Sequence, residues 1–419
     1  MAATRWVKTI LLGAAALAGA LAPNLAYAVA ESQSNPPGRS GPDIRVSLPP
    51  VDFPDWEPTD SEFGVVEYAA RFRSAVESAE PANNWVPVRA VLPARRDGPV
   101  PAVIILHYWG ARDQRFERNL GVGLARRGVG AVLIALPYHL DRTPPGARSG
   151  ERAIVPDPEA LVATMAQAVL DVRRSVDWIQ SRPEFRPDAI GLAGASLGAI
   201  VAATAVGVEP RIDTAAFLLG GADLGGILWH SSRVVRQRES LRRAGWTEER
   251  LRQALEPVEP SRFLADRRPG RSFVIAARND TVVPPANAER LIRSLGDPTV
   301  LWLDTGHYGG FFVLRQVQRE IIEFFEAEFS GRTYVPPAEI RAPVVRIGAH
   351  ADSANGLQVA AGIDIWRALD RPGEVMGTAL FTPRGPALFV GARIERGLSL
   401  GVSFRPNQVT GGLFWSIVL

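Results

Sequence analysis

Short apolar runs alternate with longer amphipathic stretches through the central part of the chain, from about residue 61 to residue 332. Some of the short runs are continuous, such as Val103-Ile104-Ile105-Leu106, as expected for strands that are covered on both faces. The runs that predict strands are 65–73, 85–92, 103–107, 129–136, 189–193, 214–219, 273–277 and 300–303, and the stretches that predict helices are 114–127, 158–180, 197–206, 285–295 and 312–329. The alternation predicts one α/β domain, in which a mostly parallel sheet carries helices on both faces.

The pattern changes beyond residue 333, where Val335-Pro336-Pro337 precedes about five short runs separated by glycine and proline turns. Residues 398–404 alternate large apolar with small side chains, and Leu413, Trp415, Ile417 and Leu419 share one face of the last run. This predicts a small antiparallel β module at 335–419. Outer-membrane strands show the same alternation, but so few strands are not expected to close a barrel alone, because single-chain barrels start at about eight. We expect a soluble accessory domain, with membrane association or self-association through the module as the alternative.

The first thirty residues have the pattern of a secretory signal. Arg5 and Lys8 precede the apolar run 10–22, and small residues at 26–28 or 28–30 follow as a cleavage site. The run is shorter than the ~20 residues of a spanning helix, which favours cleavage over the alternative of an uncleaved anchor. Residues 31–60 are rich in proline, serine and glycine and are expected to be a linker. The sequence therefore predicts export to a periplasm, cell surface or medium.

The composition limits which partners and which reactive groups the protein can have. Lysine and arginine number 47 against 44 acidic residues, a net charge of +3, so we expect no nucleic-acid partner. The chain has no cysteine, which excludes disulfides, thiol nucleophiles and cysteine metal sites. We expect neither a metal nor a cofactor, and the five histidines remain the bases to consider.

A candidate nucleophile lies in Gly194-Ala195-Ser196-Leu197-Gly198, between an apolar run and a helix-forming run. This is the strand, tight turn and helix setting of a nucleophile elbow, in which glycines allow the strand and the helix to approach closely. A serine hydroxyl needs a base. His307 is the expected base, because it follows the last predicted strand in a loop. The expected acid is Asp280, after the preceding strand, with Asp304 as the alternative.

These residues resemble the α/β-hydrolases, in the branch of exported enzymes like dienelactone hydrolase and acetyl xylan esterase. Ser196, Asp280 and His307 follow one another in the nucleophile, acid, histidine order of that family. The resemblance covers about residues 63–332 and implies that Ser196 attacks an acyl carbonyl, that His307 moves the proton, and that Asp280 orients the imidazole. It also implies an acyl-enzyme intermediate and places a cap at 224–269.

The resemblance also implies an oxyanion hole, with the backbone N–H of Leu197 as one donor. The second donor is expected from His107-Tyr108-Trp109-Gly110, where the family commonly has a glycine after the histidine and this chain has Tyr108. The N–H of either Trp109 or Tyr108 could serve. His107 is expected to brace this loop.

The sequence thus predicts a serine hydrolase that acts on small carboxylic esters. The alternative is an envelope or outer-membrane-associated binding protein whose β tail carries the function. Two further residues leave two interpretations each, and a third has one. His139 lines the cleft or is an ordinary loop histidine, and Arg233 attracts an anionic substrate or lies on a solvated helix face. His350 lies in the tail, outside the hydrolase pattern, and is expected to be structural.

Overall fold

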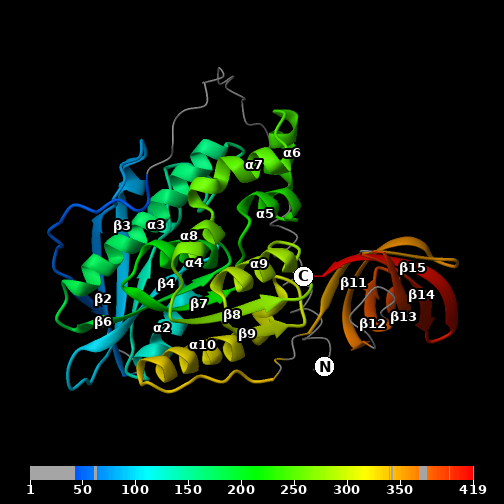
Figure 1. Ribbon diagram of the computed structural model, residues 1–419. Helices are drawn as coiled ribbons and strands as arrows, with labels where there is room; N and C mark the ends of the chain where they lie inside the picture. Colours follow the sequence, from blue (N-terminus) through cyan, green and yellow to red (C-terminus); the bar gives the residue numbers. More distant parts are fainter. Residues whose placement is uncertain are drawn as a thin grey trace. The chain divides into compact units, whose positions relative to one another are not determined.

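The computed structural model describes residues 43–60, 64–338, 340, 343–367, 375–395 and 397–418 (Figure 1). The predicted signal segment and the first part of the predicted linker lie outside these residues. Of the predicted linker, residues 43–60 are described. Ile44 is buried against the main core, and Glu57–Asp60 forms the first strand of the sheet, β1.

Nine strands form one mixed sheet in the order β1-β2-β3-β5-β4-β6-β7-β8-β9. Neighbouring strands from β5 through β9 are parallel, whereas β1, β2 and β3 pair antiparallel at one edge. The strands after β1 are β2 (Val65–Arg73), β3 (Trp85–Pro93), β4 (Val100–Leu106), β5 (Gly130–Ile134), β6 (Phe185–Ala195), β7 (Ile212–Leu218), β8 (Arg271–Ala277) and β9 (Thr299–Leu303). The carboxyl ends of the parallel strands share one edge, where ligands of such sheets bind.

Helices cover both faces of this sheet (Figure 1). One apolar layer lies between the sheet and the helices α3, α4, α8 and α9, and the other lies between the sheet and α2 and α10. The helices are α2 (Arg115–Ala125), α3 (Pro158–Gln180), α4 (Leu197–Val208), α5 (Leu224–His230), α6 (Val235–Arg243), α7 (Glu248–Leu255), α8 (Pro260–Asp266), α9 (Pro285–Leu295) and α10 (Leu314–Phe329). The predicted α/β class is confirmed. None of the helices in the described part of the chain combines the length and apolar character needed to cross a bilayer.

The helices α5 to α8 lie between β7 and β8, in the segment where the sequence predicts a cap. Their packing follows from amphipathic spacing. Leu251 and Leu255 of α7, for example, are one turn apart and are both buried in the core that also contains α3 and α4.

The C-terminal residues form a closed antiparallel barrel, and the predicted β module is confirmed in this form. Its strands are β10 (Val345–Asp352), β11 (Gly356–Arg367), β12 (Val375–Thr382), β13 (Gly385–Glu395), β14 (Leu398–Arg405) and β15 (Gln408–Val418), and β15 pairs with β10. The expectation that so few strands would leave the module open is wrong. Small inward residues let the barrel close around a few large rings, since a Cβ at Gly391 would lie 2.5 Å from the ring of Phe389.

Candidate active site

Ser196 lies in the turn between β6 and α4. Its backbone has φ +52° and ψ −112°, a region that residues with a side chain rarely adopt. The Ser196 N–H donates to the carbonyl of Leu218 on the neighbouring strand β7, at 2.8 Å. The turn therefore holds the hydroxyl at the carboxyl edge of the parallel strands.

Two glycines allow this turn. A Cβ on Gly194 would overlap the backbone of Gly198, and a Cβ on Gly198 would lie 2.5 Å from the carbonyl oxygen of Leu106 on β4. Any larger residue at either position would push the helix away from the sheet. The G-x-S-x-G spacing thus has a packing reason at both ends.

Of the three side chains predicted from the sequence, His307 lies within hydrogen-bonding distance of the other two. His307 Nε2 lies 3.0 Å from Ser196 Oγ, and His307 Nδ1 lies 2.6 Å from Asp280 Oδ2. Both ring nitrogens are engaged, so the imidazole is oriented with one nitrogen toward the hydroxyl and the other toward the carboxylate. This is the arrangement in which a serine can lose its proton to a histidine.

Asp280 is fixed by its own loop. Its Oδ1 accepts hydrogen bonds from the backbone N–H groups of Val282 and Val283, both at 2.8 Å, and the residue is 3% exposed. These bonds leave Oδ2 for His307. Asp304, the alternative acid, accepts a hydrogen bond from Asn279 Nδ2 at 3.5 Å, and the structure brings Asp280 to His307 Nδ1.

The predicted oxyanion donors lie close to the hydroxyl in the fold. Leu197 is the first residue of α4, so its N–H has no acceptor inside the helix. Tyr108 and Trp109 follow β4 and line the same cleft as Ser196 and His307. The N–H groups that the resemblance implies therefore belong to segments that flank the nucleophile.

His107 connects this loop to the neighbouring strand segment. Its Nε2 accepts from the N–H of Leu136 at 3.0 Å, and its Nδ1 lies 2.8 Å from the carbonyl oxygen of Tyr108. Since a carbonyl only accepts, the ring is neutral with the proton on Nδ1. Burial and, to a smaller extent, the nearby ring of His139 lower the pKa of His107 to about 3. The histidine is thus placed to brace the loop and has no free nitrogen for proton transfer.

His139 is buried beside His107, with ring centroids 4.8 Å apart. Its Nδ1 lies 2.8 Å from the carbonyl oxygen of Pro137, and burial lowers its pKa to about 4. It is absent from the described residues that line the cleft. The structure therefore does not bring His139 to Ser196.

Two further groups set the electrostatics of the rim. Burial raises the pKa of Tyr108, and the carboxyl of Glu117 on α2 adds to the shift. Burial also raises the pKa of Glu117 to about 7. The phenol at the rim therefore stays a neutral hydrogen-bonding group over the usual pH range.

The cleft above Ser196 encloses about 830 Å³, part of it open to solvent. Its walls are mainly apolar and aromatic, with contributions from Tyr108, Trp109, Phe116, Leu219, Tyr308 and Leu314. Arg233, from the segment between α5 and α6, also lines it. Such a cleft can hold an uncharged organic group beside the hydroxyl.

Arg233 joins the two loops that flank the nucleophile. Its Nη1 donates to the Tyr308 hydroxyl at 2.5 Å, its Nη2 donates to the Trp109 carbonyl at 3.3 Å, and its guanidinium lies 4.8 Å from the Trp109 ring centroid. From the sequence, two interpretations of Arg233 remained open, a contact to an anionic substrate or a position on a solvated helix face. The structure places it at the cleft.

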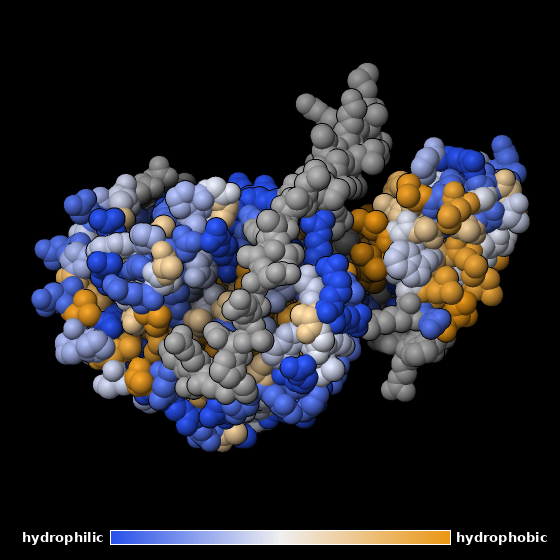
Figure 2. Space-filling model, turned by 90° about the horizontal axis from the view of Figure 1, so that it is seen from above, coloured by the Kyte–Doolittle hydropathy of each residue, from blue (hydrophilic) through white to orange (hydrophobic). Residues whose placement is uncertain are grey.

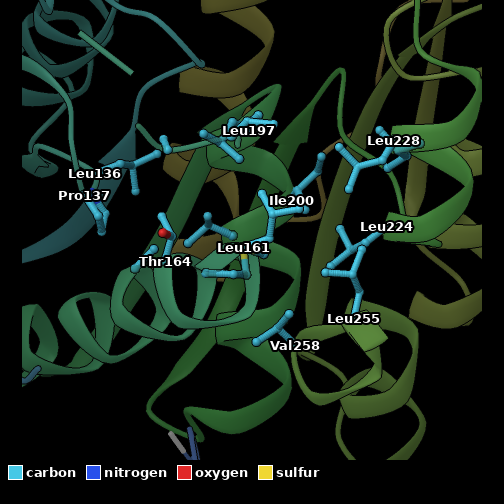
Figure 3. Close-up of a pocket in the computed structure, with 16 residues that line it drawn as sticks. Leu136, Pro137, Leu161, Thr164, Leu197, Ile200, Leu224, Leu228, Leu255 and Val258 are labelled. Atoms are coloured by element: carbon cyan, nitrogen blue, oxygen red, sulfur yellow. The ribbon is translucent and has the colours of Figure 1, made fainter. Parts of the chain in front are cut away.

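A second cavity lies on the other side of Leu197 and encloses about 680 Å³, part of it open to solvent. Figure 3 shows side chains from α3, α4 and α5 that point toward a common space, with Leu161, Leu197, Ile200 and Leu224 among them. The hydroxyl of Thr164 is the polar group among the labelled side chains. Sequence reasoning missed this cavity. The sequence feature that could have indicated the cavity is the set of leucines in the predicted cap. The packing of α5 and α7 is needed to bring these leucines against α4.

Comparison with known proteins gives the fold. No protein-family model matches the chain. Acetyl xylan esterase from Paenibacillus sp. R4 shares 19% identity with a TM-score of 0.52, over 64% of this chain and 87% of that one. Acetyl xylan esterase 1 from Thermoanaerobacterium sp. JW/SL YS485 shares 17% identity with a TM-score of 0.48, over 65% and 89%. The first likeness and the sheet order show that the chain has the α/β-hydrolase fold, as predicted.

The curated relatives add a sequence match without a function. An uncharacterized protein of Mycobacterium tuberculosis, found in two strains, is 30% identical over 233 residues, which are 54% of this chain and 54% of the relative. The chain therefore spans about half the length of the curated relatives it matches.

Proposed function

We propose that the protein is an exported serine hydrolase that cleaves small carboxylic esters through an acyl-enzyme intermediate. The single observation that carries this proposal is the pair of hydrogen bonds of His307, at 3.0 Å to Ser196 Oγ and 2.6 Å to Asp280 Oδ2. The strained turn at Ser196 and the neighbouring helix N-terminus support it, because both belong to the nucleophile elbow.

In the proposed reaction, His307 Nε2 takes the proton of Ser196 as Oγ attacks the ester carbonyl carbon. The carbonyl oxygen becomes negative and receives hydrogen bonds from the N–H of Leu197 and from the N–H of Tyr108 or Trp109. The imidazolium then gives its proton to the alcohol oxygen, the ester C–O bond breaks, and the acyl group stays on Ser196. Water, deprotonated by the same imidazole, releases the acid and restores the serine.

The two cavities support an organic ester as the substrate class. The cleft at Ser196 is mainly apolar, and the second cavity is lined by Leu197, the residue that follows the candidate nucleophile. Burial of apolar substrate surface in such spaces contributes about 25 cal/mol per Å². The guanidinium of Arg233 supplies a polar contact at the mouth.

The test is the hydrolysis of p-nitrophenyl esters of increasing acyl length by the purified chain and by Ser196→Ala. We expect kcat of the variant to fall by about 10⁶-fold, because the attacking oxygen is removed. A fluorophosphonate probe should label the parent chain and not the variant. The matched control is Ser403→Ala, which removes a buried serine hydroxyl that also lies next to a histidine.

Two results would contradict the proposal. One is turnover by Ser196→Ala at the parent rate, and the other is equal loss in Ser196→Ala and Ser403→Ala. The export part of the proposal rests on residues 1–30 and is tested separately. A chain that lacks them should remain in the cytoplasm of expressing bacteria, while the full chain leaves it.

A further inference from the structure

The outward positions of the C-terminal barrel are apolar on every strand. Fourteen of the nineteen large hydrophobic side chains that are exposed in the described part of the chain belong to β11 through β15. Examples are Val359 at 72% exposure, Leu400 at 54% and Val409 at 64%. The outward row of β10, namely Val345, Ile347, Ala349 and Ala351, is also apolar and is half-buried. Figure 2 shows apolar residues gathered over the barrel.

The inward positions carry the polar groups. Arg346 and Asp364 form an ion pair at 2.8 Å whose side chains are each 3% exposed, and Thr378 donates to the same carboxylate at 2.7 Å. His350 and Ser403 are both fully buried. They share the interior with a small group of rings and aliphatic side chains that includes Phe389 and Phe414. Among the described residues, the barrel therefore places most of its charged groups inside and apolar groups on its outward rows, with the exposed Glu395 opposite Leu398 at the end of β13 as an exception. This is the reverse of a barrel that faces water.

One protein partner would not cover this surface. A typical stable interface buries about 800 Å² on each partner, which lies on one side of a molecule. Here the apolar side chains continue over consecutive strands around the barrel. A continuous apolar exterior requires a surrounding apolar medium, and lipid hydrocarbon is such a medium.

The dimensions fit a bilayer. The strands contain 8 to 12 residues. At ~3.4 Å per residue and a tilt of ~45°, they would span about 19–29 Å, close to the ~25 Å apolar band of outer-membrane barrels.

Aromatic residues mark both ends of the barrel. Trp366 and Trp415 are each 53% exposed and pair with strand residues beside the β11–β12 and β13–β14 connections. Phe381 and Phe404 are 43% and 42% exposed and lie at the opposite end, beside the β12–β13 and β14–β15 turns. Aromatic rings at the two interfaces are a feature of proteins that sit in bilayers.

We propose that the exterior of this barrel contacts the hydrocarbon of a lipid bilayer and anchors the chain there. Six strands are fewer than the eight of the smallest single-chain outer-membrane barrels, and side chains fill the interior. The barrel is thus an anchor and not a channel. The anchor does not depend on the proposed reaction, since none of the described barrel residues is among those that line the cleft.

The first test uses vesicles of phosphatidylcholine and phosphatidylglycerol whose acyl chains are brominated. Bromine quenches tryptophan fluorescence at short range, so we expect quenching of the full chain relative to vesicles without bromine. In Trp366→Phe/Trp415→Phe the bromine-dependent quenching should fall at least twofold, because the other tryptophans of the described chain lie outside the barrel. Equal quenching in both proteins, or none in either, would overturn the proposal.

The second test places a charge on the outward surface. Val402→Arg should reduce the partition of the full chain into floating vesicles by about 30-fold or more, since arginine near the midplane of a bilayer is strongly disfavoured. The matched control is Val235→Arg on α6, because the two valines have similar exposures of 37% and 42%. Circular dichroism in detergent checks that both variants fold.

Two outcomes of this second test would reject lipid as the medium. One is equal flotation of Val402→Arg and Val235→Arg, and the other is failure of the parent chain to float at all. A fixed oligomer in lipid-free buffer, with both barrel tryptophans shielded, would instead assign the surface to copies of the chain.

Discussion

Within the residues that the structure describes, a serine, a histidine and an aspartate come together in two places, which differ in almost everything else. At the sheet edge, His307 contacts Ser196 and Asp280 at 3.0 and 2.6 Å. In the barrel, His350 Nε2 lies 2.7 Å from Ser403 Oγ, while its Nδ1 lies 3.6 Å from Asp352 Oδ2. The second distance is too long for a hydrogen bond.

The surroundings of the two clusters differ more than the distances. Ser196 lines an open cleft next to a helix N-terminus, whereas Ser403 and His350 are 0% exposed inside a barrel. Asp352 accepts hydrogen bonds from the N–H groups of Ala354 and Asn355, in its own turn. The same three residue types therefore form a candidate reactive site where the serine is accessible, the acid is bonded to the histidine and N–H donors lie nearby. In the barrel, without these features, they pack an interior.

We expect the largest difference between the two clusters when the aspartate of each is replaced and kcat is measured. Asp280→Asn should lower kcat by about 10⁴-fold, because the amide no longer holds His307 in the tautomer that accepts the serine proton. Asp352→Asn should leave kcat for a soluble ester unchanged. Kinetics on one ester measure both variants. A loss of similar size in the two would show that the barrel cluster takes part in catalysis.

A fall in pH should reduce the folding stability more through the loop histidines of the hydrolase region than through His350. Burial holds the pKa of His107 at about 3 and that of His139 at about 4, below the value of 6.5 expected in the unfolded chain. The unfolded state therefore binds protons first, and stability is lost as the pH falls below 6.5. Each histidine should cost about 2 kcal/mol between pH 7 and pH 5.

The matched variants for this effect are His107→Gln and His350→Gln, with denaturant unfolding at pH 7 and pH 5. Burial also lowers the pKa of His350, but the charge of Asp352 opposes the shift. His107→Gln should therefore remove more of the acid dependence than His350→Gln. The opposite order would contradict this account of the two environments.

The smallest expected effect concerns backbone strain. Ser196→Gly should raise the free energy of unfolding by about 1 kcal/mol, because glycine adopts φ +52° freely and, in a cleft that is partly open to solvent, water can replace the hydroxyl as the partner of His307. Ser403→Gly should lower it by about 1 kcal/mol, because the buried His350 loses its partner. Thermal unfolding of both variants checks the signs, and destabilisation by Ser196→Gly would remove the case for strain.

The sheet and the three site residues could be predicted because each lies where an apolar strand run ends. Ser196, Asp280 and His307 follow β6, β8 and β9, and carboxyl ends of parallel strands meet at one edge. The sequence favoured Asp280 over Asp304, although both lie near a strand end, and the coordinates bring Asp280 to His307 Nδ1. Arg233 and the second cavity depend on how four short helices pack, which apolar periodicity does not determine.

The barrel was the harder part to predict. The inward positions of β10 include Arg346, His350 and Asp352, so polar residues interrupt its apolar outward row and no continuous apolar run marks the strand in the sequence. Counting apolar runs therefore gave about five strands where the structure has six. In a β module whose exterior is apolar, polar residues in the sequence can mark the positions that face the interior.

The position of Arg233 has a consequence for how this fold could acquire new substrates. Of the described residues that line the cleft, it alone carries a permanent charge, and it comes from the connection between α5 and α6, in the segment between β7 and β8, and not from the sheet. The candidate catalytic residues and the charged residue at the mouth of the cleft are therefore encoded in separate stretches of the gene. Exchange of the segment between β7 and β8 could change the charge at the mouth of the cleft while the positions of the candidate catalytic residues stay the same.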